Sequence, residues 1–93
     1  MHIGVLQIEI LVPMSGSLKV KRSVLNSLKA RLRNRYNASV AETGHLDKWQ
    51  KSALCVVSVL NDKTKLDSYM NSILNFVQDT KDITVIDCHL DFF

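Results

Sequence analysis

The order of periodic segments in this 93-residue sequence predicts an α+β fold of the ferredoxin-like βαββαβ class, in one domain spanning residues 1–93. Two observations support this prediction. Four stretches have the character of strands, most of them with apolar residues at every second position. Two other stretches repeat apolar residues every three or four positions, as amphipathic helices do. Right-handed crossovers then place both helices on one face of a four-stranded antiparallel sheet, in the spatial order 4-1-3-2.

The first strand is expected over residues 3–12, IGVLQIEILV, where apolar and mixed positions alternate. Pro13 cannot extend the hydrogen-bonded ladder, and Gly16 allows a turn. Ser17 is a suitable N-cap for a helix that continues to Tyr36. The core stripe of this helix is predicted to consist of Val20, Val24, Leu25, Leu28, Leu32 and Tyr36.

The middle of the chain is interpreted as a short strand at residues 38–43, a loop at residues 44–50 with the only Trp, and a third strand at residues 52–60. In the third strand two sets of residues alternate, one of them formed by Leu54, Val56 and Ser58. We expect this set on the open face of the sheet. The aliphatic surface of that face would consist of Val5, Leu11, Leu54, Val56 and Val85.

A second helix is predicted to follow Thr64, which would cap it in a capping box with Asp67, and to end near Thr80. Its core stripe would be Leu66, Met70, Ile73 and Val77. The last strand is expected over residues 83–92, again with period two.

Cys55 and Cys88 are the only cysteines, and they form neither a CxxC pattern nor a set with His at ligand spacing. We interpret them as two small buried thiols. The predicted strand order puts one strand between them, which separates them by roughly 9–10 Å. Because Cα atoms joined by a disulfide lie within about 7 Å, we predict no disulfide. No metal or cofactor is indicated.

Two features bear on location. No apolar run approaches the roughly 18 residues needed to span a bilayer. The first residues also lack the charged, apolar and cleavage regions of a secretory signal. We therefore expect a cytoplasmic location and no association with a membrane.

Positive charge is concentrated in the first helix, which holds seven of the chain's twelve Lys and Arg residues and no acidic residue. These seven are Lys19, Lys21, Arg22, Lys29, Arg31, Arg33 and Arg35. Such a segment suggests a polyanionic partner, whose phosphates it would bind in a salt-dependent and largely sequence-independent manner. The alternative is a solvated polar face, in which the stems of Arg31 and Arg35 cover the edge of the core.

The segments SLKVKR, SLKARLRNRYNASVAE and DKWQ together resemble the YlxP-like family of small bacterial proteins, a domain of unknown function. The resemblance covers Met1 to about Phe76, and the tail IDCHLDFF is less characteristic. It implies a bacterial, cytoplasmic protein with a ferredoxin-like fold. Genes of this family often lie beside genes for translation initiation and ribosome maturation. The resemblance implies no activity and no catalytic residue.

We therefore expect a non-enzymatic factor that contacts RNA or the ribosome through its first helix, with no evident small-molecule substrate. The alternative is a protein-interaction module that self-associates through the open face of the sheet. Its contacts would include Val5, Leu54, Val56 and the loop residue Trp49. Trp49 would otherwise stack on a base or close the end of the small core. A third hypothesis is acid–base or metal chemistry at Glu9, Asp87, His89 and Asp91.

Overall fold

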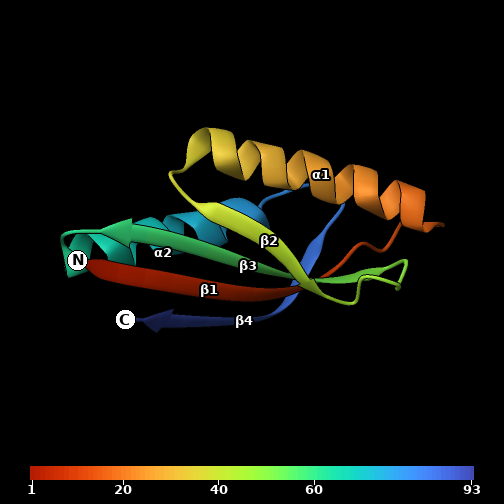
Figure 1. Cartoon of the computed structure of the whole chain (residues 1–93). Helices are drawn as coiled ribbons and strands as arrows, with labels where there is room; N and C mark the ends of the chain where they lie inside the picture. The colour runs from red at the N-terminus through yellow and green to blue at the C-terminus, as the bar shows by residue number, and fades with distance from the viewer.

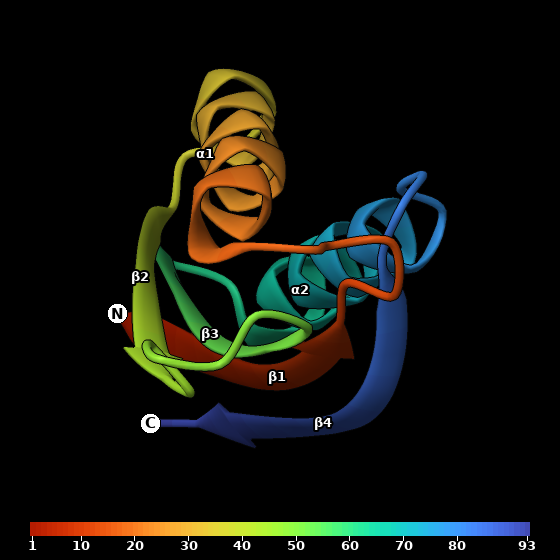
Figure 2. The ribbon, with the colours of Figure 1, turned by 90° about the vertical axis from the view of Figure 1, so that its right-hand side faces the viewer.

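The computed structural model describes all 93 residues and has the predicted order of elements. The strands are β1 (His2–Leu11), β2 (Ser39–Gly44), β3 (Lys51–Leu60) and β4 (Thr84–Phe92), and the helices are α1 (Leu18–Arg35) and α2 (Lys63–Gln78). The sheet order β2-β3-β1-β4 is the predicted order 4-1-3-2 read from the other edge, and every neighbouring pair is antiparallel. Both helices lie on one face, α1 over β2 and α2 over the other strands (Figures 1 and 2).

The core lies between the helices and the two central strands. On β1, Leu6, Ile8 and Ile10 are at most 1% exposed. On α2, the predicted stripe of Leu66, Met70, Ile73 and Val77 is completely buried. Burying a side chain of this size contributes about 1.5–3 kcal/mol, so these two faces supply much of the driving force for folding.

The two helices begin at different kinds of cap. Ser17 caps α1 as predicted, and its hydroxyl accepts a hydrogen bond from the Val20 N–H at 3.2 Å. The N-cap predicted for α2 is wrong by two residues, because Asp62 and not Thr64 caps this helix. The Asp62 carboxylate accepts a hydrogen bond from the Lys65 N–H at 2.9 Å. Its negative charge also interacts favourably with the positive end of the helix dipole.

The buried stripe of α1 differs from the prediction at its first residue. It consists of Lys21, Leu25, Leu28, Leu32 and Tyr36, at spacings of four, three, four and four. Val20, which was predicted to lie in the stripe, is 45% exposed. Neither helix of the protein is both long enough and apolar enough to cross a lipid bilayer.

The prediction for the two faces of β3 is wrong. Val56 pairs with Leu6 and Leu54 pairs with Ile8, so both lie on the helix-facing side and are completely buried. The open face carries the other set, Ala53, Cys55, Val57 and Val59. Cross-strand partners point to the same side of a sheet, so the orientation of β1 determines that of β3.

β4 contains a bulge that changes which of its side chains point toward the helices. Glu9 pairs with Asp87 but Ile10 pairs with Val85, which leaves Ile86 as the extra residue. Val85 therefore packs against the core and not on the open face as predicted, whereas Ile86 is 45% exposed.

Both cysteines are free, which confirms the prediction that no disulfide forms. Their interpretation as buried thiols is wrong. Cys55 is half-buried on the open face of β3, and Cys88 is exposed on the edge strand β4.

Gly4 allows α2 to approach β1 closely, and this predicts the effect of a substitution. A Cβ atom at Gly4 would lie 2.7 Å from Met70 Cγ and 3.0 Å from Met70 Sδ. We expect Gly4→Ala to lower the free energy of unfolding by about 1–3 kcal/mol through overpacking. Urea denaturation of a double-mutant cycle tests this: the cost of Gly4→Ala should largely disappear in a Met70→Ala background. An equal cost in both backgrounds would show that the contact with Met70 is not the cause.

Candidate polyanion-binding surface

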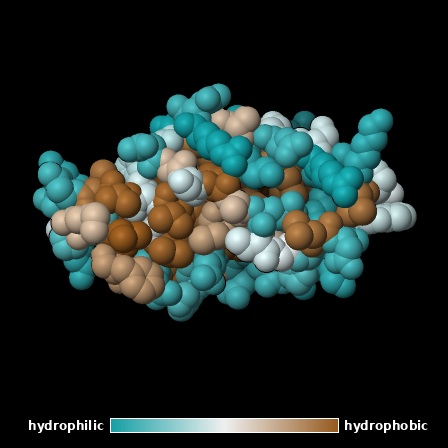
Figure 3. All heavy atoms as spheres, viewed as in Figure 1, coloured by the Kyte–Doolittle hydropathy of each residue, from teal (hydrophilic) through white to brown (hydrophobic).

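α1 presents a row of cations that the protein leaves unpaired. Of its seven basic residues, only Lys21 lies within 4 Å of a carboxylate oxygen. We call the other six, Lys19, Arg22, Lys29, Arg31, Arg33 and Arg35, the basic face of α1. All of them are exposed except Lys29, which is half-buried. Figure 3 shows hydrophilic side chains gathered along this helix.

Lys21 is a buried structural ion, and the prediction that it contacts a phosphate is wrong. Its side chain is only 1% exposed. The Nζ atom donates a hydrogen bond to the His45 carbonyl at 2.6 Å and lies 3.5 Å from Glu42 Oε2. The same Oε2 accepts the Ser52 hydroxyl at 2.7 Å. An ammonium group held in this way has internal partners and no access to an external anion.

Gln50 joins the two loops at this end of the molecule. Its side-chain amide donates to the Pro13 and Ser15 carbonyls at 3.3 and 3.2 Å, and its backbone carbonyl accepts the Val12 N–H at 2.8 Å. Gln50, the last residue of the segment DKWQ, is therefore bonded to the loop that immediately precedes the segment SLKVKR.

Five of the six residues of the basic face form two flanks. Arg33 faces β2, where its guanidinium donates to the Val40 carbonyl at 2.8 Å. Arg22 and Lys29 lie on the same stripe of the helix as Arg33, and we call these three residues the outer flank. Arg31 and Arg35 lie on the α2 side, where both guanidinium groups are over the ring of Phe76.

Trp49 is 55% exposed, so the interpretation that it closes the core is wrong. Leu46 in the same loop is 61% exposed, and Met14 in the neighbouring loop is 83% exposed. Trp49 therefore remains available for a contact outside the chain.

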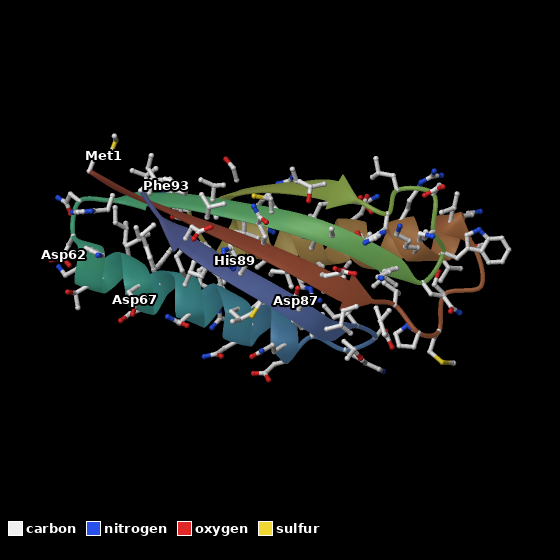
Figure 4. The ribbon with its side chains drawn as sticks, turned by 90° about the horizontal axis from the view of Figure 1, so that it is seen from below. Met1, Asp62, Asp67, Asp87, His89 and Phe93 are labelled. Carbon is white, nitrogen blue, oxygen red and sulfur yellow. The ribbon has the colours of Figure 1, made fainter.

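The open face of the sheet carries polar side chains, among them Asp87 and His89 (Figure 4), as well as apolar ones. Val5 is half-buried there, but Leu54 and Val56, which were predicted to contact a partner, are completely buried on the other side. The apolar residues present in their place are Ala53, Cys55, Val57 and Val59.

The ion pairs of the predicted polar cluster form two separate groups, and Asp87 belongs to neither. Glu9 Oε1 lies 2.9 Å from Lys51 Nζ and 3.4 Å from His45 Nε2, whereas His89 pairs with Asp91 at 3.1 Å. Beside them is a hollow of about 150 Å³ lined in part by Gln7, Glu9, Thr43, Asp87 and His89. No group of three or more His, Cys, Asp or Glu side chains is arranged to hold a metal ion.

The hydrogen bond from Lys51 lowers the pKa of Glu9 below its usual value. The positive charges of Lys51 and His45 act in the same direction, while desolvation opposes them. Glu9 is therefore ionised at neutral pH and helps to hold the β2–β3 turn against β1.

Sequence patterns could have identified some residues that were missed. Lys21 lies four positions before Leu25, so its place on the core stripe was available from spacing. Phe76 gave no such signal, because its contact with Arg31 and Arg35 depends on how α1 and α2 are placed in space.

The fold and the basic face together define a small α+β domain with a cationic helix on one side. The chain belongs to the family described as a protein of unknown function (DUF503), whose model matches residues 3–90. It is 30% identical over 81 residues to the uncharacterized protein YlxP of Bacillus subtilis (strain 168), covering 87% of this chain and 88% of that protein. The YlxP-like resemblance is thus confirmed, and it extends beyond Phe76 into β4.

A solved structure is also similar. It is described as LarC2, the C-terminal domain of a cyclometallase involved in the synthesis of the NPN cofactor of lactate racemase, in apo form. The TM-score is 0.42 at 18% identity, and the match covers all of this chain. The chain spans 56% of the length of that chain.

The environment of Lys21 predicts a large loss of stability on its replacement. Lys21→Met keeps the aliphatic stem but leaves Glu42 without its cation and the His45 carbonyl without a donor. We expect the free energy of unfolding to fall by about 2–4 kcal/mol, measured by urea denaturation. The control Arg22→Met, on an exposed residue of the same helix, should change it by less than about 0.5 kcal/mol. Equal stability of the two variants would contradict the structural role of Lys21.

The lowered pKa of Glu9 predicts a pH dependence. Because the folded-state value is below the unfolded one, the contact stabilises the fold above the unfolded pKa and is lost as the pH falls through the folded pKa. We expect Lys51→Met to raise the pKa of Glu9, measured by carbon-detected NMR titration of its carboxylate. The stability difference between variant and wild type should be present at neutral pH and vanish in acid. An unchanged pKa would show that Lys51 does not cause the shift.

Proposed function

We propose that this protein is a non-enzymatic RNA- or ribosome-associated factor that contacts phosphates through the basic face of α1. One observation carries the proposal: six cations lie along one helix without a carboxylate within 4 Å of any of them. Like charges on one helix repel each other, and a polyanion relieves this repulsion while releasing its own counterions. The chain's acids elsewhere do not supply this compensation.

The shape of the surface favours a backbone-reading mode. The 18 residues of α1 extend over about 27 Å, which is long enough to follow several phosphates. Some RNA-binding sheets stack bases on aromatic residues of their central strands. β1 and β3 of this protein contain no Phe, Tyr or Trp, so base stacking on the open face would contribute little. Binding through α1 should therefore be salt-dependent and weakly selective for sequence.

A second candidate is self-association through the open face of the sheet. The observation that favours it is the group of apolar residues on that face, where Val5 and Val57 are half-buried and Val59 is 47% exposed without a covering element. An apolar interface holds or tightens in kosmotropic salt, whereas phosphate contacts weaken as salt rises. A salt series therefore separates the two candidates.

The proposed function predicts that charge on α1, rather than total charge, determines RNA affinity. Arg22→Gln with Lys29→Gln should weaken binding of a fluorescent oligouridylate about threefold to tenfold and reduce the slope of log K against log salt by up to about 1.4. The measurement is fluorescence anisotropy at several salt concentrations.

The matched control is Lys63→Gln with Lys65→Gln, which removes the same charge from the exposed first turn of α2. This pair should change affinity by less than about twofold, because charges beyond a Debye length of about 10 Å are screened. Equal losses of RNA affinity for the two pairs of substitutions would show that affinity depends on the net charge of the protein and not on the position of the charges. No binding by the wild-type protein at low salt would refute the proposed function.

A further inference from the structure

A groove runs along α1 on the side opposite the outer flank, bordered by Phe76 of α2 and by the turn at residues 81–82. One hollow of about 340 Å³ is lined by Arg31, Asn34, Arg35 and Phe76. A second, of about 370 Å³, is lined by Ser23, Val24, Ser27, Arg31, Lys81 and Asp82. Because Arg31 lines both, the two hollows adjoin along α1. We call this combined space the interhelical groove.

The two arginines of the groove are held in place by aromatic rings. The guanidinium carbons of Arg31 and Arg35 lie 5.6 and 5.4 Å from the centroid of the Phe76 ring, and that of Arg35 also lies 5.8 Å from the Tyr36 centroid. Cation–π contact orients a guanidinium group without neutralising it. Neither arginine has a carboxylate within 4 Å, although Asp82 lines the far hollow. The result is two oriented positive charges with free hydrogen-bond donors.

The groove also supplies neutral donors. The Asn34 amide lies between the two arginines in the sequence and lines the same hollow, and the hydroxyls of Ser23 and Ser27 line the other. Lys81 adds a third cation from the turn before β4. Planar guanidinium forks next to amide and hydroxyl donors match the several oxygens of a phosphate group.

We propose that the interhelical groove binds a phosphate group bridged by Arg31 and Arg35, and that this phosphate belongs to the backbone of a bound RNA. The inference rests on the proposed function and specifies its contact site. The outer flank differs from the groove, because Arg22, Lys29 and Arg33 line none of the protein's hollows. The outer flank provides attraction at a distance, whereas the groove combines charge, oriented guanidinium groups and neutral donors.

The test compares two charge-matched pairs of substitutions. Arg31→Gln with Arg35→Gln removes two charges from the groove, and Arg22→Gln with Lys29→Gln removes two from the outer flank. Glutamine keeps part of the stem that covers Phe76, and thermal unfolding confirms that each variant folds. We expect the groove pair to weaken oligouridylate binding about thirtyfold to a hundredfold, against threefold to tenfold for the flank pair. Arg31→Lys with Arg35→Lys should fall between them, because charge is kept and the fork is lost.

NMR of the arginine Nε–Hε groups gives a second measurement on the wild-type protein. Added oligouridylate should shift the Arg31 and Arg35 signals before that of Arg22. Equal losses for the two glutamine pairs, with no preferential shift, would overturn the groove site and leave the proposed function intact.

If the wild-type protein binds no oligouridylate at low salt, the proposed function fails, and uridine monophosphate and inorganic phosphate become the probes. Saturable shifts at Arg31 and Arg35 with either probe would support a phosphate site for a small molecule. No shift with either probe would overturn the groove site as well.

Discussion

The placement of α1 depends on the buried ammonium group of Lys21. A charge that is only 1% exposed costs several kcal/mol unless it is paired and hydrogen-bonded. Here the partners come from separate segments: Glu42 from β2, the His45 carbonyl from the β2–β3 turn, and through Glu42 the Ser52 hydroxyl of β3. If the start of α1 moved away from the sheet, Glu42 would lose its cation and Lys21 would lose both of its partners.

The backbone of the β2–β3 turn is adapted to this ion. His45 has a φ of 57°, in the left-handed region that non-glycine residues adopt at a cost. Its carbonyl accepts the hydrogen bond from Lys21, and its ring lies 3.4 Å from Glu9. One residue therefore contacts both α1 and β1, which offsets the cost of its conformation.

The order of elements and of strands was predictable, because period-two and period-three-four patterns and right-handed crossovers allow few arrangements. Lys21 was predicted to point outward because it is a lysine. Its spacing of four residues from the core residue Leu25 indicated instead that it lies on the buried stripe. Alternation in β3 placed Leu54 and Ala53 on opposite faces of the strand, but it did not determine which of the two faces the helices. The bulge at Ile86 and the contact of Phe76 with two arginines depend on tertiary packing, for which local patterns carry no signal.

The far end of α1 is fixed as well as its start. The Tyr36 ring meets Tyr69 and Phe76 edge-on, at centroid distances of 5.4 and 5.9 Å, and its hydroxyl lies 3.0 Å from Ser72 Oγ. A helix held at both ends keeps its row of cations in one geometry. Binding to such a row costs less conformational entropy than binding to a flexible basic segment.

The ion pairs of the acidic residues make the distribution of net charge over the molecule uneven. Glu42 compensates Lys21, and Glu9 compensates Lys51, so both glutamates of the chain are already engaged. Asp62 and Asp67 on α2 and Asp87 on β4 are seen in Figure 4 from the side where α1 lies behind the strands. A domain with cations on one helix and carboxylates without an ion-pair partner mostly on another side orients an approaching polyanion as well as attracting it. The charge distribution therefore favours encounters in which α1 meets the polyanion first and the acidic side points away.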